Sequence, residues 1–390
     1  MARAAAIIAA ALFICGVALL FMFDLIAARI RERGPITAAE YMDLALYDPR
    51  AGYYSGAAQR SGRQGDFFTS VDVGPLFGEL LAEQFAEMWT LLKEQGADAF
   101  DLVEAGAGNG RLARDVKDAA AADHPDFYEA IRLYLVERST IARDAHPGTL
   151  GPHAPRLAAS SGELPGKVAG VIYANELLDA MPAHRVVMTA DGLREIRVGL
   201  RDGALAEVEA DLVDPAIEQQ ITGGGMTLAV GARADVSIAA TSWVRAAADA
   251  LQSGFLVIVD YGHHARELYS AARAGGTLMT YRGHLAAGHT WLDQPGRQDL
   301  TTHVDLSAVQ RAAERAGLRT LGIVDQTYFL TSLGLADRLH PGEDRGALAR
   351  RLAAKTLIVP GGLGSTMKVM VFCRMPGAPE LRGLASQRLT

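Results

Sequence analysis

The stretch Asp101-Leu102-Val103-Glu104-Ala105-Gly106-Ala107-Gly108-Asn109-Gly110 decides the fold, and the helix-like segment Arg111–Lys117 follows it. An apolar run leads into three closely spaced glycines and then into a helix, which is the unit that builds open parallel sheets. Glycines in such a turn let the backbone approach a ligand closely at the carboxyl edge of the sheet. The pattern G-x-G-x-G, with Glu104 two residues before it, differs from the G-x-G-x-x-G of dinucleotide sites.

The carboxylate of Glu104 indicates which cofactor the glycines hold. A dinucleotide places its pyrophosphate at the helix N-terminus, where a neighbouring carboxylate would repel it. S-adenosyl-L-methionine has no phosphate and carries an ammonium and a sulfonium, so an acid is favourable beside it. We therefore predict binding of S-adenosyl-L-methionine, rather than a tight turn that holds no ligand. The predicted cofactor-binding residues of this loop are Glu104, Gly106, Ala107, Gly108 and Gly110.

Short apolar runs alternate with helical segments after this motif, which predicts βαβ units and a parallel sheet buried on both faces. The runs are Phe100–Glu104, Ile131–Glu137, Val168–Asn175 and Phe255–Asp260. Between the third and fourth runs, strand-like pieces are separated by Asp191-Gly192 and Asp202-Gly203, and Asp-Gly favours type I′ hairpin turns. An antiparallel meander inserted into the α/β core is predicted for the pieces Val186–Met188, Leu193–Leu200 and Ala204–Glu209.

Two strand ends carry further polar candidates. Glu137 ends the second run, where a carboxylate can accept hydrogen bonds from both ribose hydroxyls of a nucleoside; an ordinary exposed glutamate is the alternative. Asn175 ends the third run, and Glu176 and Asp179 follow it. On a helical turn, these two acids would face the site together, whereas a capped turn with solvated acids is the other interpretation. We take Glu137 and Asn175 as cofactor-binding candidates and the two acids as catalytic candidates.

Composition and charge exclude several classes of function. The chain has 390 residues, of which 49% are hydrophobic and 21% charged, so it can bury a sizeable core. Its formal net charge of −7 gives no overall field that attracts nucleic acid, and we predict no nucleic-acid partner. Two cysteines cannot form a disulfide framework or a zinc site, and none of the ten histidines has a metal-ligand spacing. We expect no metal site.

The N-terminus contains 20 residues, Ala4–Phe23, without a charge or a proline, which is enough to cross a bilayer as a helix. Arg29, Arg31 and Arg33 follow, so the positive-inside rule would keep the rest of the chain on the cytoplasmic side. Alternatively, Met22 is the true start and the chain is cytoplasmic without a tether. A cleaved signal peptide is disfavoured because the apolar run is too long and lacks a clear small-x-small cleavage site.

A long loop separates the N-terminal helices from the glycine motif. Within it, Gly65-Asp66-Phe67-Phe68-Thr69-Ser70 combines a glycine hinge with two aromatic residues. We predict that this segment closes over the bound cofactor, with a loop that simply packs on the sheet as the alternative. The expected division is a hydrophobic segment over 1–28, a helical and lid region over 29–98, and a core over 99–390 with its β insertion at about 184–235.

The sequence resembles the MidA family, bacterial and mitochondrial class I S-adenosylmethionine-dependent methyltransferases, from Gly34 to about Phe372. Besides the glycine motif, the resemblance rests on Gly34-Pro35-Ile36, Ala45-Leu46-Tyr47-Asp48-Pro49, Gly52-Tyr53-Tyr54, Gly65–Ser70, Asn175–Pro182, Asp260-Tyr261-Gly262, Tyr281-Arg282-Gly283-His284, Asp299–Asp305 and Met367-Lys368-Val369. Two segments depart from the family pattern. Val71-Asp72 stands where Ser-Pro-Glu is usual, and Ala234-Asp235-Val236-Ser237 replaces an acidic patch, which puts substrate contacts there in doubt.

The resemblance implies a Rossmann-like class I methyltransferase sheet with an N-terminal helical lid and an inserted β meander. It also implies methylation of arginine on a protein partner, of the type that occurs during the assembly of respiratory complexes. Glu176 and Asp179 would then orient the guanidinium, localise its charge and take the released proton. Two rival functions are a non-catalytic assembly factor with a vestigial cofactor pocket and a methyltransferase that acts on a small-molecule nitrogen or oxygen.

Overall fold

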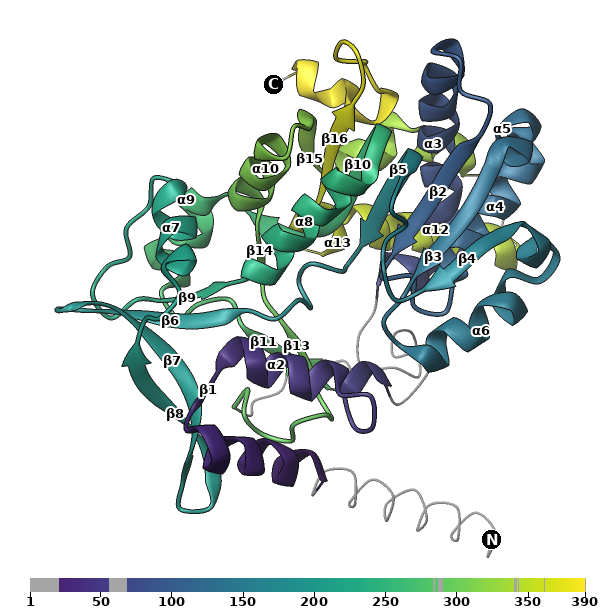
Figure 1. Cartoon of the computed structure of the whole chain (residues 1–390). Helices are drawn as coiled ribbons and strands as arrows, with labels where there is room; N and C mark the ends of the chain where they lie inside the picture. The colour runs from purple at the N-terminus through teal and green to yellow at the C-terminus, as the bar shows by residue number, and fades with distance from the viewer. Residues whose placement is uncertain are drawn as a thin grey trace, which may run out of the picture.

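A central sheet of mainly parallel strands forms the α/β core (Figure 1). In spatial order its strands are β15 (Arg319–Asp325), β16 (Met367–Arg374), β10 (Leu251–His263), β5 (Val168–Asn175), β2 (Phe100–Ala105), β3 (Ile131–Val136) and β4 (Leu157–Ser161). Only β16, the last of them in the chain, runs antiparallel to its neighbours β10 and β15. The short β14 (Val304–Asp305) pairs in parallel with the last residues of β10. The predicted α/β class is confirmed.

In this computed structural model, the described residues are 21–55, 69–282, 285–286, 290–339, 342, 344–360 and 362–389. The first four residues of the predicted lid, Gly65–Phe68, and all but the end of the N-terminal apolar run lie outside them. Lid closure therefore stays a prediction, as does the expected division of the chain into three regions.

Helices cover both faces of the central sheet because successive side chains of a strand point to opposite faces. On β10, Phe255, Val257 and Val259 pack into one apolar cluster, while Leu256 and Ile258 pack into another. The first face is covered by α3 (Leu76–Glu94), α4 (Arg111–Asp123), α5 (Pro125–Ala130), α11 (Gln326–Ser332) and α12 (Arg345–Ile358), and the second by α8 (Ile238–Ala250) and α10 (Leu306–Arg315). The central strands are thus buried on both sides, as their continuous apolar runs predict.

A second sheet contains the predicted meander. β6 (His184–Thr189), β7 (Gly192–Arg201) and β8 (Ala204–Asp211) are antiparallel, and β9 (Arg233–Val236) pairs with β6. The Asp202-Gly203 turn has positive φ at both residues, as a type I′ turn requires. The same expectation is wrong at Asp191, which has no positive φ; there the Thr189 hydroxyl donates to the Gly192 carbonyl (2.8 Å) and closes the turn instead.

Two helices and a third sheet complete this side of the molecule. α7 (Pro215–Gly223) and α9 (Ala265–Leu268) pack against the second sheet. A three-stranded sheet has the order β12 (Leu285–Ala286), β11 (Met279–Arg282) and β13 (Asp299–Thr301). The chain between the central strands β5 and β10 supplies four of the five strands of the second sheet, and the three-stranded sheet follows β10 in the chain. Together these two sheets form the β layer.

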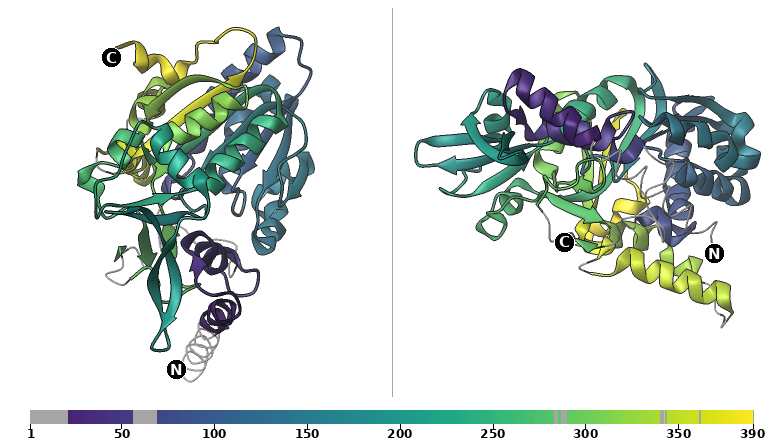
Figure 2. Two further views of the ribbon diagram at one scale, coloured as in Figure 1. Left: turned by 60° about the vertical axis from the view of Figure 1, so that its left-hand side comes forward. Right: turned by 90° about the horizontal axis from the view of Figure 1, so that it is seen from below.

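The N-terminal helices pack on this β layer. Residues 21–33 are helical, and α2 (Ala38–Tyr47) begins after Thr37, whose side chain accepts a hydrogen bond from the Glu40 N–H (3.0 Å). β1 (Ile36–Thr37) between them pairs with β7. Figures 1 and 2 show both helices and the second sheet on the same side of the central sheet. Among the described residues, no helix combines the length and the apolarity needed to cross a bilayer.

A chain that starts at Met22 is expected to fold and to bind cofactor normally, whereas a chain that starts at Arg33 should be destabilised. Met22, Ile26 and Ile30 are buried in the cluster that joins the N-terminal helices to the β layer. The shorter chain lacks all three side chains, so the cluster loses this packing. Loss of a buried side chain costs about 2–5 kcal/mol. Thermal unfolding compares the two with the full chain, and equal melting temperatures for all three would contradict the expectation.

Candidate active site

A cavity of about 860 Å³ opens at the carboxyl edge of the central sheet. Its wall includes eight of the nine site residues predicted from the sequence, and the ninth, Gly110, ends the glycine loop as the N-cap of α4. The eight are Glu104, Gly106, Ala107, Gly108, Glu137, Asn175, Glu176 and Asp179. The sheet topology brings them together because the ends of β2, β3 and β5 are neighbours.

The glycine loop has a backbone that other residues would not tolerate. Gly106, Gly108 and Gly110 all have positive φ, at +70°, +51° and +85°. A Cβ added at Gly106 would lie 3.0 Å from Leu177 Cδ1, and one at Gly110 would lie 3.2 Å from Leu135 Cδ1. A Cβ at Gly108 would meet no atom within 4 Å, so the backbone here is open to the cavity. The loop therefore forms a cradle for a ligand.

Two side chains fix the peptide groups of Gly108. Its N–H donates to Glu137 Oε2 (2.9 Å), and Glu137 Oε1 accepts from the Ser139 N–H (2.8 Å). Its carbonyl lies 2.9 Å from His146 Nε2, on α6 (Thr140–Leu150). Since a carbonyl only accepts, Nε2 carries the proton and Nδ1 accepts from the Ser160 hydroxyl (2.9 Å). Glu137 is thus held against the glycine loop by two backbone hydrogen bonds, and its contact with a ribose stays a prediction.

Sequence reasoning missed His146, because a single histidine within a helix gives no motif. Its side chain is fully buried, which lowers its pKa below the usual histidine value and keeps the ring neutral. A neutral ring with one donor and one acceptor matches its two partners. His146 therefore acts as a positioning residue for the glycine loop.

Glu104 is buried beneath the loop, with 4% of its surface exposed. Its Oε2 accepts a hydrogen bond from the Tyr173 hydroxyl (3.0 Å), which stands on the neighbouring strand β5. Burial raises the pKa of Glu104 to about 8, and the hydrogen bonds from Tyr173 and the Ala113 N–H only partly offset that rise. The free protein thus holds this carboxyl largely protonated at neutral pH.

Replacement of Glu104 by glutamine should flatten the fall of stability with pH. Between the usual glutamate pKa and the folded value of about 8, the folded state binds the extra proton, so the free energy of unfolding decreases as the pH rises. The loss is about 1.4 kcal/mol for each pH unit in that window. Thermal unfolding from pH 5 to pH 9 measures it. The control is E209Q, at an exposed strand position, which should keep the wild-type dependence of the free energy of unfolding on pH. If E104Q showed that same dependence, the prediction would be refuted.

The segment after β5 forms a strained loop, and the expected helical turn is wrong. Glu176 adopts φ +52°, a left-handed conformation that is costly for a residue with a side chain. The Asp260 carboxylate explains the loop, because its Oδ2 accepts from the Leu177 and Leu178 N–H groups (3.1 and 2.7 Å) and draws them away from helical pairing. Glu176 and Asp179 nevertheless both line the cavity.

Glu176 and Asp179 are acids in an environment that disfavours charge. Glu176 Oε1 accepts from the Ser70 N–H and from Asn175 Nδ2, both at 3.1 Å, yet desolvation raises its pKa to about 8. Asp179 has 7% of its surface exposed, and its Oδ1 has no hydrogen-bond partner in the described part of the chain. Burial and the neighbouring charges of Asp260 and Glu176 raise the pKa of Asp179. Asn175 Oδ1 is a second buried acceptor without a partner there.

The described end of the predicted lid connects to the glycine motif. The Arg111 guanidinium, at the start of α4, donates to Asp72 Oδ1 (2.7 Å) and to the Val71 carbonyl (2.9 Å). Asp72 Oδ2 accepts from the N–H and the hydroxyl of Thr69 (3.0 and 2.9 Å). The departure from the family pattern at Val71-Asp72 therefore still supplies a buried acid that holds this rim of the cavity.

The second departure is structural. Asp235 Oδ1 accepts from the Arg185 guanidinium (2.8 Å), and its Oδ2 accepts from the Thr277 and Leu278 N–H groups (2.6 and 2.8 Å). Arg185 and Asp235 are both buried. The Asp235 side chain therefore joins two segments of the β layer.

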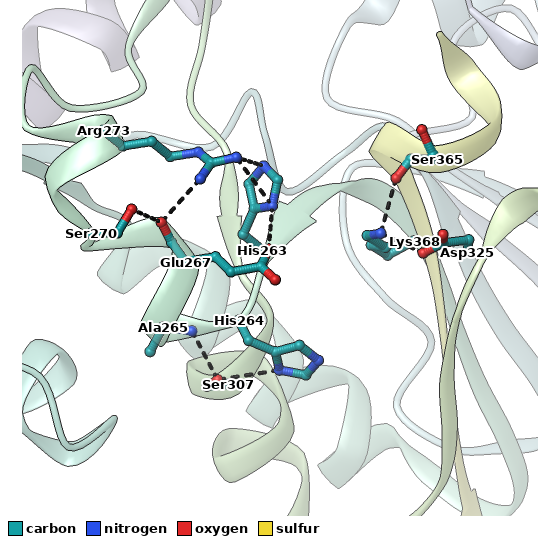
Figure 3. Close-up of polar contacts among 10 residues, drawn as sticks. All are labelled: His263, His264, Ala265, Glu267, Ser270, Arg273, Ser307, Asp325, Ser365 and Lys368. Carbon is teal, nitrogen blue, oxygen red and sulfur yellow. Dashed lines mark hydrogen bonds and ion pairs between the residues drawn. The ribbon is translucent and has the colours of Figure 1, made fainter. Parts of the chain in front are cut away.

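A layer of neutral imidazoles lies behind part of the cavity wall. Figure 3 shows His263, at the end of β10, between Arg273 and Glu267: the guanidinium donates to Nε2 (2.9 Å), and Nδ1 is 3.0 Å from the Glu267 carboxylate. The His263 ring packs 5.2 Å from the ring of His303, which lines the cavity. Burial, together with the neighbouring His263 and the positive charge of Arg273, lowers the pKa of His303 to about 4. His303 is therefore uncharged at neutral pH.

Within the described residues, no group of three or more histidine, cysteine, aspartate or glutamate side chains is arranged to hold a metal ion. The cavity wall contains the glycine loop after β2, the Glu137 carboxylate after β3, and the acids Glu176 and Asp179 after β5. Such a site can hold a nucleoside-like cofactor beside a cationic acceptor group.

Comparisons with known proteins agree with this arrangement. Residues 80–324 match the family described as "Putative S-adenosyl-L-methionine-dependent methyltransferase". The mitochondrial protein arginine methyltransferase NDUFAF7 of Mus musculus is 30% identical over 338 residues, which are 80% of this chain and 73% of that protein. The Homo sapiens protein of the same name is 28% identical over 348 residues, with the same two coverages.

Solved structures extend the likeness to nearly the whole chain. A crystal structure from Burkholderia thailandensis, bound to S-adenosyl-homocysteine, superposes with a TM-score of 0.85 at 32% identity and covers 95% of this chain and 96% of that one. A native crystal structure of a protein from the same species gives a TM-score of 0.83 at 31% identity, with the same coverages. The match of the family model and the shared architecture place this chain in the family of S-adenosyl-L-methionine-dependent methyltransferases.

Proposed function

We propose that this protein transfers the methyl group of S-adenosyl-L-methionine to the guanidinium of an arginine side chain in a protein partner. The observation that carries the proposal is the buried carboxylate of Asp179, which lines the same cavity as Glu176 and whose Oδ1 has no hydrogen-bond partner among the described residues. Within the described residues, neither acid forms an ion pair with an arginine or lysine of the chain itself. The relatives named protein arginine methyltransferase support the same acceptor.

The residues at the glycine loop fit the cofactor. The open backbone at Gly108 leaves room for it, and the second lone pairs of the Glu137 carboxylate can accept from ribose hydroxyls. Asn175 Oδ1, buried and without a described partner, can accept a further hydrogen bond from it. When bound, S-adenosyl-L-methionine supplies a methyl group on a positively charged sulfur. The chain's own residues then have to bring a nitrogen to that group and remove a proton.

Glu176 and Asp179 can perform both tasks on a guanidinium. An arginine side chain stays protonated at neutral pH, so its nitrogens have little free electron density. Two carboxylates that accept from its N–H groups localise the positive charge away from one nitrogen and hold it in line for attack. The methylated guanidinium carries one proton in excess, and either carboxylate can accept it, since the pKa of each is raised.

The same pKa values give the reaction an expected pH dependence. Below about pH 8, Glu176 of the free enzyme is increasingly protonated and loses its attraction for a cation. Hence kcat/KM for an arginine acceptor should rise with pH towards about 8 and level off above it. E176Q should lack this limb, because glutamine does not titrate. An unchanged profile in E176Q would assign the limb to another group.

The experiment that tests the function uses the purified full chain, cofactor labelled on its methyl group, and a cell lysate. Label on arginine of a protein supports the proposal, and label on a small molecule, or on another side chain, overturns it. No transfer, despite binding of S-adenosyl-homocysteine, favours the non-catalytic assembly factor. The partner that we propose is a respiratory complex subunit, met on the cytoplasmic side, with or without a tether through residues 4–23.

A further inference from the structure

Asp299 lines the same cavity and takes part in none of the roles above. It begins β13, and only 2% of its surface is exposed. Its Oδ1 accepts two hydrogen bonds, from the Tyr54 hydroxyl (2.8 Å) and from the Leu300 N–H (3.0 Å). Two donors on one oxygen fix the orientation of the carboxylate.

Tyr54 and Tyr47 connect Asp299 to the loop that carries Asp179. The two tyrosine rings are stacked, with centroids 5.5 Å apart and planes at 24°. The Tyr47 hydroxyl donates to the Ala180 carbonyl (2.9 Å), directly after Asp179, and the Thr302 N–H donates to the Asp179 carbonyl (2.9 Å). The loop after β5 and the strand β13 are therefore held together from two sides.

Asp179 and Asp299 act on the same part of the cavity. The charge of Asp299 contributes to the raised pKa of Asp179. Burial, and then the charges of both acids, raise the pKa of Tyr281, which also lines the cavity. Two carboxylates that line one cavity favour the binding of a cation in it. Tyr47, Tyr54 and Tyr281 surround this part of the cavity with aromatic rings, which also favour a cation.

We propose that Asp299 is a further substrate-contacting carboxylate and that Tyr54, by its hydrogen bond, is the positioning residue that orients it. The inference rests on the proposed function: Asp179 and Asp299 contact the arginine guanidinium from two directions. A guanidinium presents five N–H donors in a planar fork, whereas a lysine ammonium is a compact point charge. A pair of carboxylates fixed in orientation therefore selects arginine over lysine.

The test uses full-length protein saturated with S-adenosyl-homocysteine, titrated by NMR with Nα-acetyl-argininamide and, separately, with Nα-acetyl-lysinamide. Y54F should weaken binding of the arginine probe about fivefold or more, the loss of one hydrogen bond to a charged group. D299N should weaken it further and remove the preference for arginine over lysine. Affinity for S-adenosyl-homocysteine should stay at the wild-type value in both variants.

Y41F is the matched control. Tyr41 lies on α2 in the same segment, and its buried hydroxyl donates to the Trp291 carbonyl (3.1 Å) away from the cavity. It should lose stability as Y54F does and keep wild-type binding of both probes. With the acceptor found by labelling, Y54F should raise KM and change kcat by less than about twofold, since the hydrogen bond orients an acid that binds substrate.

The outcomes separate the two proposals. If wild-type protein labels arginine while Y54F and D299N bind the arginine probe as wild type does, Asp299 has no role in recognition and only this inference falls. If Y41F weakens binding as much as Y54F does, the effect is general loss of packing, and the inference falls again. If wild-type protein labels no arginine at all, the proposed function itself fails, and this inference fails with it.

Discussion

Replacement of Gly106 by valine is expected to abolish binding of S-adenosyl-homocysteine. The residue has φ +70°, which disfavours any side chain, and its Cβ would lie 3.0 Å from Leu177 Cδ1. Leu177 belongs to the loop that carries Glu176 and Asp179, so the added methyl groups displace either the glycine cradle or that loop. We expect affinity to fall by at least about 100-fold, which corresponds to about 2.7 kcal/mol. Calorimetry on the folded variant measures it.

Gly96→Val is the control for backbone strain. Gly96 also has a positive φ, +91°, but a Cβ there would meet no atom within 4 Å, and the residue follows α3 away from the cavity. Both variants should unfold at a lower temperature, and only G106V should lose the ligand. Normal affinity in a folded G106V would show that the glycine loop does not hold the cofactor.

Elements whose sequence signals are local could be predicted from the sequence alone. Continuous apolar runs mark the buried strands to within a few residues, as Val168–Asn175 shows, because a strand covered on both faces has no polar alternation. The Asp202-Gly203 turn and the capped start of α2 at Thr37 are equally local. The glycine motif is recognisable because three positive φ angles within five residues require glycine.

Contacts between distant segments could not be predicted in this way. Asp260 changes the expected helical turn at Glu176 into a strained loop, although 84 positions separate the two residues. His146 and Tyr54 contact partners in other elements, Gly108 and Asp299. His146 belongs to no recognised motif, and the segment Gly52-Tyr53-Tyr54 does not reveal that its last residue donates a hydrogen bond to Asp299. The topology of the sheet, rather than any sequence pattern, brings these groups to one edge.

The N-terminal run shows a different limit. Hydropathy treats Met22 and Ile26 like the residues before them, yet both are buried in the cluster between the first helices and the β layer. A side chain that packs inside a globular fold and one that faces lipid are equally apolar. Hydropathy therefore does not reveal where an apolar run becomes part of the fold.

Glu176→Gln and Asp179→Asn are expected to reduce kcat while S-adenosyl-homocysteine binds as before. Each amide keeps the shape of the acid and removes the charge that holds the guanidinium and the oxygen that takes its proton. Loss of a group that acts in the transition state lowers kcat by about 10²–10⁴-fold. The double variant should lose less than the product of the two single effects, because both act on the same guanidinium.

D43N provides the matched comparison. Asp43 also lines the cavity, but its carboxylate pairs with Arg138 (2.8 Å), so it is already neutralised and has no cation to recruit. Its turnover should stay within about twofold of wild type, since an exposed ion pair contributes little. If E176Q and D179N turned over as D43N does, the two acids would be bystanders. Transfer to arginine would then need another group to take the proton, and the buried carboxyl groups that remain in the described wall of the cavity are Glu104 and Asp299.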